Sequence, residues 1–142
     1  MVCAFFGHRD CPASVKPKLF ETIKRQIEQG TTRFYVGNNG NFDTMALSCL
    51  KTLKKEYKDI RYAVVIAYIS ADKNEYLPEE TVFPEGIETV PKRFAIDFRN
   101  RWMIDHSDTV ISYIAHSFGG AAKYVKKAKN KGAVIINLFE DN

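Results

Sequence analysis

The stretch RNRWMIDHSDTVISYIAHSFGG, residues 99–120, decides the fold class of this chain. It begins as a helix with an apolar stripe and continues into a strand of β-branched and aromatic residues, 109–114. A glycine pair, Gly119 and Gly120, then opens another helix. In an open parallel sheet, ligands usually sit at the loop that leaves the carboxyl end of a strand. Because glycines let a backbone approach closely and a helix N-terminus presents free N–H groups, we expect an anionic small molecule there, one that bears phosphate.

The same alternation of strand and helix extends in both directions from this stretch. An unbroken apolar run that ends at Gly7 predicts a central strand buried on both faces. The expected strands are residues 2–6, 34–36, 62–68, 109–114 and 133–138, and the helices are expected to begin near 13–17, 41–43, 93 and 120. This order predicts an α/β, Rossmann-like three-layer sandwich with a mostly parallel sheet of about five strands, in a single domain over residues 1–142.

Residues 70–91 have no clear periodicity and hold several prolines and acids. We expect a loop there, with one helical turn around Tyr76 and a short extended piece at residues 87–90.

Composition narrows the class of protein. The 142 residues are 45% hydrophobic and 27% charged, with a net charge of +4, which permits an anionic partner without demanding nucleic acid. No apolar run is long enough to span a bilayer, and the first residues lack the basic leader of a signal peptide. The cysteines Cys3, Cys11 and Cys49 are few and scattered, which favours reduced thiols in a cytoplasm and no metal site. We expect no cofactor and no membrane partner.

Glycines and polar side chains follow three of the expected strands. Because the carboxyl ends of parallel strands meet at one edge of the sheet, these loops are expected to converge on one pocket. The predicted ligand-binding residues are Gly7, His8, Arg9, Gly37, Asn38, Gly40, Asp43, Arg99, Ser117, Gly119 and Gly120.

Simpler interpretations of these residues stay open. Gly7 and Gly37 have an equal claim as plain turn residues between a strand and a helix. Arg9 follows a buried strand and needs an anionic partner, which is either a ligand or a carboxylate such as Asp10 or Asp43. His8 is expected to be solvated or satisfied by the backbone, with ligand contact as the alternative.

Three motifs together resemble the SLOG superfamily: FGHR at 6–9, the loop Gly37-x-x-Gly40-x-x-Asp43, and Arg99-Asn100-x-x-Met103-x-x-x-Ser107-Asp108. This Rossmann-like group includes the Lonely Guy phosphoribohydrolases and the DNA-processing protein A domain. The resemblance covers nearly the whole chain and is closest to short proteins with a Gly-His-Arg turn. It implies binding of nucleotides or nucleotide-derived ligands at the strand ends, and it favours a homo-oligomer.

The chain departs from the enzymes of that superfamily at one essential position. Arg99 matches the arginine of those enzymes, but the glutamate that follows their Pro-Gly-Gly-x-Gly-Thr turn is absent, and Lys126 stands in its place. A carboxylate is needed to stabilise an oxocarbenium-like ribosyl centre or to activate water beside it. We therefore expect a nucleotide-binding sensor or regulatory protein. The alternative is a nucleoside 5′-monophosphate phosphoribohydrolase that uses Arg99 with a displaced carboxylate, Asp43 or Asp105.

Side chains on the helix over residues 93–106 have further expected roles. Arg99 and Arg101 lie two residues apart, so a helix points one towards the cleft and the other towards solvent or a subunit. Asp108 is expected to form a structural ion pair with Arg9 or Arg101, because an acid near a helix C-terminus is otherwise unfavourable. Trp102 and Met103 are expected in the core or at a dimer contact.

A lysine cluster marks the last expected helix, at Lys123, Lys126, Lys127, Lys129 and Lys131. Its ordinary interpretation is a solvated face. Binding of DNA through these lysines is a weaker functional alternative, since no arginine–aromatic pattern accompanies them.

Overall fold

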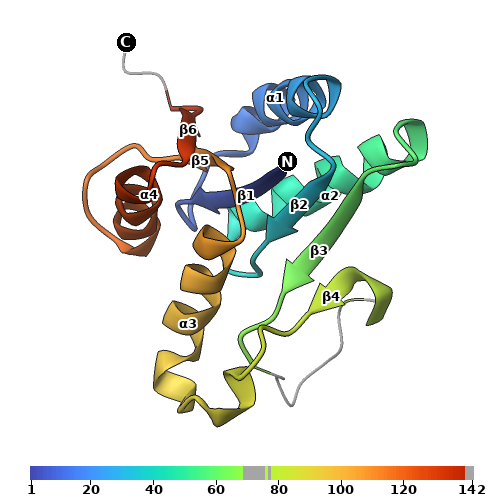
Figure 1. Cartoon of the computed structure of the whole chain (residues 1–142). Helices are drawn as coiled ribbons and strands as arrows, with labels where there is room; N and C mark the ends of the chain where they lie inside the picture. The colour runs from blue at the N-terminus through green and yellow to red at the C-terminus, as the bar shows by residue number, and fades with distance from the viewer. Residues whose placement is uncertain (69–75, 77, 140–142) are drawn as a thin grey trace.

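The computed structural model describes residues 1–68, 76 and 78–139 (Figure 1). The strands are β1 Val2–Gly7, β2 Arg33–Val36, β3 Arg61–Val65, β4 Thr81–Val82, β5 Thr109–Tyr113 and β6 Val134–Asn137. The α-helices are α1 Lys16–Glu28, α2 Asn41–Glu56, α3 Lys92–Asp105 and α4 Gly120–Lys131, with 3-10 turns η1 Ala13–Val15, η2 Pro78–Glu80 and η3 Ile87–Thr89.

The strands form one six-stranded parallel sheet in the order β4-β3-β2-β1-β5-β6. The chain moves from β1 outward through β2, β3 and β4, and then returns to place β5 on the other side of β1. The direction of winding therefore reverses between β1 and β5. Ligands of open α/β sheets bind at the carboxyl ends of the strands beside such a reversal.

Helices cover both faces of the sheet, with α1 and α2 on one side and α3 and α4 on the other (Figure 1). Neighbouring residues of β1 alternate between the two layers. Cys3 and Phe5 pack with α1 and α2, whereas Ala4 and Phe6 pack with α3 and α4. All four are at least 94% buried, and this is why the strand reads as an unbroken apolar run. The predicted Rossmann-like α/β architecture is confirmed.

The sheet has one strand more than the prediction of about five. The additional strand is β4, a two-residue edge strand beside β3 in the segment expected to be a loop. Two residues are too short to produce a periodic pattern. The prediction of an extended piece at residues 87–90 is wrong. Ile87–Thr89 forms a 3-10 turn, and Gly86 before it has the left-handed conformation, at φ 85°. The helical turn expected around Tyr76 falls on a segment mostly outside the described residues.

β3 ends at Val65, although the apolar run continues through Ile66 and Ala67. Ile66 and Ala67 are both buried, so the apolar run predicts burial correctly but overestimates the length of strand β3. In the described part of the chain, no helix is long and apolar enough to cross a membrane.

Asp108 ties the start of β1 to β5. Its carboxylate accepts a hydrogen bond of 2.9 Å from the backbone N–H of Val2. The expected ion pair of Asp108 with Arg9 or Arg101 is therefore wrong, since Arg101 instead pairs with Asp97 at 2.9 Å and Asp108 has no ion pair with a described residue. The bond from a backbone N–H to an ionised carboxylate is charge-assisted, so it gives Asp108 a partner without an arginine.

Gly7 is required by packing. A Cβ on Gly7 would lie 2.3 Å from Cγ of Phe42, whose ring is fully buried in the first turn of α2. We expect Gly7→Ala to lower the free energy of unfolding by about 1–3 kcal/mol through overpacking, measured by urea denaturation. Gly120→Ala is the matched control: apart from its chain neighbours and the backbone of its own helix, no atom lies within 4 Å of its added Cβ, so stability should not fall. Equal stability of Gly7→Ala and wild type would contradict this packing role.

Candidate functional site

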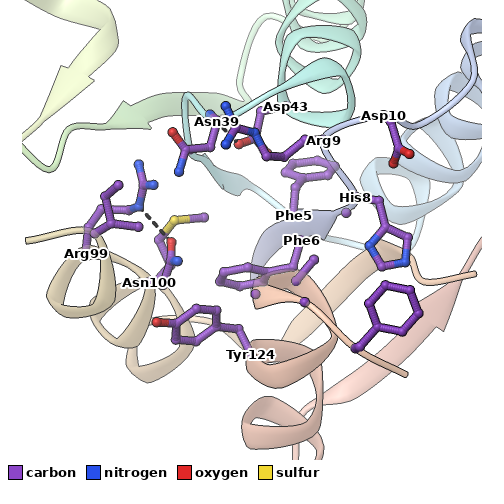
Figure 2. A pocket seen from close by; sticks show the side chains of 18 of the residues that line it. Phe5, Phe6, His8, Arg9, Asp10, Asn39, Asp43, Arg99, Asn100 and Tyr124 are labelled. Carbon is purple, nitrogen blue, oxygen red and sulfur yellow. Dashed lines mark hydrogen bonds between the residues drawn. The ribbon is translucent and has the colours of Figure 1, made fainter. Parts of the chain in front are cut away.

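A pocket of about 520 Å³ opens at the carboxyl ends of β1 and β2 and is bounded by α3 and the start of α4. It lies at the reversal between β1 and β5, where loops distant in the sequence meet. Of the predicted ligand-binding residues, those that line it are Gly7, His8, Arg9, Gly37, Asp43, Arg99, Gly119 and Gly120. In Figure 2, Arg99, Asn100 and Tyr124 face Asn39, Asp43 and Arg9 across the pocket.

Three predicted residues lie outside the lining, and two of them support it. Asn38 accepts a hydrogen bond from Arg99, and Gly40 packs against Arg9. A Cβ on Gly40 would lie 2.6 Å from Cα of Arg9, and its φ of 102° is one that side chains rarely adopt. Ser117 is exposed and does not reach the pocket.

Arg99 is the most buried charged side chain of the described residues, with 1% of its surface exposed. Its Nη1 donates to the carbonyl oxygen of Val65 and to Oδ1 of Asn38, both at 2.9 Å, and its Nε donates to Oδ1 of Asn100 at 2.7 Å. These acceptors come from the end of β3, the loop after β2 and α3 itself. Burial lowers the pKa of Arg99, and the nearby Asp43 carboxylate opposes that effect. Arg101 points outward and is exposed, as the spacing predicted.

Asp43 faces Arg99 across Gly37. A Cβ on Gly37 would lie 3.0 Å from Oδ2 of Asp43 and 3.2 Å from Nη1 of Arg99, so the absence of a side chain lets the two groups converge. Oδ2 of Asp43 also accepts a hydrogen bond of 2.9 Å from the N–H of Asn39. Removal of the carboxyl from water raises its pKa to about 6, against the lowering effects of Asn39 and Arg99.

Asn100 connects Arg99 to a second polar group. Its side chain hydrogen-bonds to Tyr124, whose hydroxyl donates to Oδ1 of Asp97 at 2.5 Å. Asp97 in turn pairs with Arg101. The bond from Tyr124 is the largest cause of the lowered pKa of Asp97, and burial together with that bond raises the pKa of Tyr124 to about 12. The side of the pocket formed by α3 and α4 is thus held by a continuous hydrogen-bond chain.

His8 accepts a hydrogen bond of 3.0 Å at Nε2 from the N–H of Ala115, which places its proton on Nδ1. Burial, followed by the neighbouring His116, lowers the pKa of His8. The backbone partner confirms the simpler interpretation of this residue. His8 still borders the pocket as a neutral ring.

Two sources of positive potential lie at the opening. Arg9 is exposed and has no ion pair with any described residue, so neither of the expected carboxylate partners, Asp10 or Asp43, neutralises it. The N-terminus of α4 has Gly119 as its N-cap residue, so it has no side-chain cap, and it carries no acid in its first turn. Its free N–H groups and helix dipole therefore favour an anion at the pocket.

Several lining residues were not predicted from the sequence: Phe5, Phe6, Asp10, Asn39, Ile96, Asn100, Met103, His116, Phe118, Ala121 and Tyr124. Asn100 and Phe118 are adjacent in the sequence to Arg99 and Gly119. A prediction that includes the immediate neighbours of these two residues would therefore have found them. Tyr124 lies one turn into α4 and has no local signal, because only the packing of α4 against α3 brings it to the pocket.

Neither a metal site nor a lysine-rich pocket wall accompanies this arrangement in the described residues. There, no three His, Cys, Asp or Glu side chains are grouped to hold a metal ion. The lysines of α4 lie largely on its solvent side. Lys123 pairs with Asp97 at 3.9 Å and Lys131 with Asp105 at 4.0 Å.

No protein-family model matches the chain, and no curated protein is significantly similar to it. Among solved structures, DNA processing protein A (DprA) from Streptococcus pneumoniae matches with a TM-score of 0.69 and 18% sequence identity. The match covers 94% of this chain and 48% of the DprA chain, so this chain spans about half the length of that protein. At this identity the likeness shows the fold alone, and that fold agrees with the Rossmann-like fold that the resemblance implies.

The raised pKa of Asp43 predicts a pH dependence of stability. Its carboxyl titrates near 6 in the folded chain and near 3.8 when exposed, so the folded state binds more protons between these values. The contribution of Asp43 to the free energy of unfolding should therefore fall as the pH rises from about 4 to about 6. NMR of the Asp43 carboxyl carbon should give a titration midpoint near pH 6. The Asp43→Asn variant should lack this titration, and its free energy of unfolding should depend less on pH between about 4 and 6. A midpoint at or below 4 would contradict the desolvation of this carboxyl.

Proposed function

We propose that the pocket binds a nucleotide or nucleotide-derived small molecule and that the chain acts as a sensor or regulatory module. The observation that carries the proposal is the convergence of Arg9, Arg99 and the uncapped N-terminus of α4 on one pocket at the reversal of the sheet. This combination of cationic side chains and free backbone donors suits a phosphate group.

The size and lining of the pocket support a ligand larger than phosphate alone. A volume of about 520 Å³ lies in the range of small-molecule sites. The floor consists largely of buried apolar side chains, among them Phe6 and Met103, while the polar groups gather at Arg99, Asp43 and the opening. An apolar floor with a few placed polar groups fits a molecule with a charged end and a less polar body.

The position of Arg99 supports a role in orienting the bound ligand rather than in attracting it from solution. Its guanidinium is already held by Val65, Asn38 and Asn100 before any ligand arrives. These bonds use its Nε and Nη1, and Arg99 lines the pocket. Arg9, which is exposed and has no ion pair with a described residue, is better suited to attract the anion first.

A second candidate function, hydrolysis of a nucleoside 5′-monophosphate, is favoured by one observation. Asp43 is a carboxyl at the pocket with a pKa of about 6, close to the value that suits a general acid or base at neutral pH. It would replace the glutamate that the phosphoribohydrolase pattern has and this chain lacks. Binding without turnover remains our first proposal, because the glutamate position holds Lys126.

The first proposal predicts a ligand-dependent rise in melting temperature with a panel of nucleoside mono-, di- and triphosphates, cyclic nucleotides and ADP-ribose. A ligand at one hundred times its Kd stabilises the folded state by about 2.7 kcal/mol, which corresponds to a rise of several degrees. Arg9→Ala should weaken binding roughly 10- to 100-fold through loss of a charge-assisted contact. Arg25→Ala, which removes another exposed arginine on α1, should leave affinity unchanged. No shift with any member of the panel at millimolar concentration would overturn the proposal.

The hydrolase alternative predicts release of free base from the nucleoside monophosphate that binds best, detected by chromatography. Asp43→Asn keeps the size of the side chain but removes its acid–base function, so release should fall at least 100-fold while binding persists. Binding without any free base in the wild-type reaction would reject the hydrolase and retain the binding protein.

A further inference from the structure

Three aromatic rings are stacked in succession at one wall of the pocket. The ring of His8 stacks on His116 with centroids 3.8 Å apart and planes 13° from parallel. His116 stacks in the same way on Phe118, at 3.8 Å and 16°. All three rings belong to residues that line the pocket. Phe118 ends the stack, so one of its faces is covered by His116 and the other has no ring against it among the described residues.

The exposure of Phe118 is not required by the fold. With 70% of its surface exposed, it is the most exposed large hydrophobic residue in the described part of the chain. It lies in the loop between β5 and α4 and contributes to none of the hydrophobic cores. Ligand pockets are commonly lined by apolar and aromatic side chains, and Phe118 is an aromatic residue at such a pocket.

The stack is held in place before any ligand is present. His8 is fixed at Nε2 by the N–H of Ala115, and its ring lies nearly perpendicular to the ring of Tyr113, at 89°. The Nδ1–H of His116 donates to the carbonyl oxygen of Phe118 at 3.0 Å, which restrains the loop between these two residues. A flat surface that is already ordered loses little conformational entropy when a second ring is added to it.

We propose that the free face of Phe118 is the stacking surface for the heteroaromatic base of the ligand. This inference rests on the proposed function and adds the placement of the base. Phe118 directly precedes Gly119, the N-cap residue of α4, so a base stacked on its ring leaves the sugar and phosphate beside the helix N-terminus and Arg9. Stacking accepts any base with a planar face, so Phe118 selects nucleotides over sugar phosphates without choosing among bases.

The test compares AMP with ribose 5-phosphate, which shares the phosphate and the sugar but lacks the base. Isothermal titration should show that Phe118→Ala weakens AMP binding about 5- to 100-fold, the usual range for loss of one base–aromatic stack. Affinity for ribose 5-phosphate should be unchanged. Phe118→Trp should retain AMP binding, whereas Phe118→Leu, which keeps apolar volume without a π-face, should behave like Phe118→Ala.

Two controls separate stacking from a structural role. The melting temperature of ligand-free Phe118→Ala should equal that of wild type, because the side chain is mostly exposed. Phe94→Ala, which removes an aromatic ring with 51% exposure that does not line the pocket, should not change AMP affinity.

The outcomes distinguish this inference from the function on which it rests. If wild type binds AMP and Phe118→Ala binds it equally well, the stacking surface is wrong and the binding function stands. An equal loss of AMP and ribose 5-phosphate affinity in Phe118→Ala would also overturn stacking, since the loop would then act on the phosphate end. If the wild-type chain binds no member of the nucleotide panel, the binding function and the stacking surface both fail.

Discussion

The buried guanidinium of Arg99 is the constraint on which the architecture of the pocket depends. A cation removed from water must be given hydrogen-bond acceptors by the protein, or its burial is strongly unfavourable. Here the carbonyl oxygen of Val65, the side chain of Asn38 and the side chain of Asn100 supply them. These groups tie α3 to the end of β3 and to the loop after β2. The same contacts therefore hold the wall of the pocket and orient the charge inside it.

The glycines around this group let side chains and backbone approach closely, in different ways. Gly37 leaves room for Asp43 and Arg99 to lie on either side of it, and Gly40 allows the loop to pack against Arg9. Gly7 makes room for the ring of Phe42 in the first turn of α2. By contrast, a side chain at Gly120 would meet nothing in the free protein. The first three are therefore explained by packing of the chain itself, whereas Gly120 is not.

The pocket joins a rigid polar network to a hydrophobic surface. On one side, Arg99, Asn100, Tyr124 and Asp97 form a chain of hydrogen bonds that keeps charged groups in fixed positions. On the other, the stacked rings end at an exposed phenyl face. Preorganised polar and aromatic groups of this kind bind with little loss of conformational entropy. Asp43, which lies near Arg99 and has a raised pKa, makes the charge of the pocket depend on pH near 6.

Local sequence patterns determined the layered α/β class, the central position of β1 and the opposite directions of Arg99 and Arg101, because periodicity and helical spacing act over a few residues. They also identified the glycines and arginines at the strand ends. Only the tertiary structure decided the strand order and the short strand β4. It also decided that Arg99 hydrogen-bonds to Asn38 and Val65, which are 61 and 34 residues away in the chain. Sheet order brings such residues together, and it depends on long-range packing that no local pattern encodes. The partner of Asp108, the pKa of Asp43 and the placement of Tyr124 were decided in the same way, since each depends on which groups surround a side chain once water has been excluded.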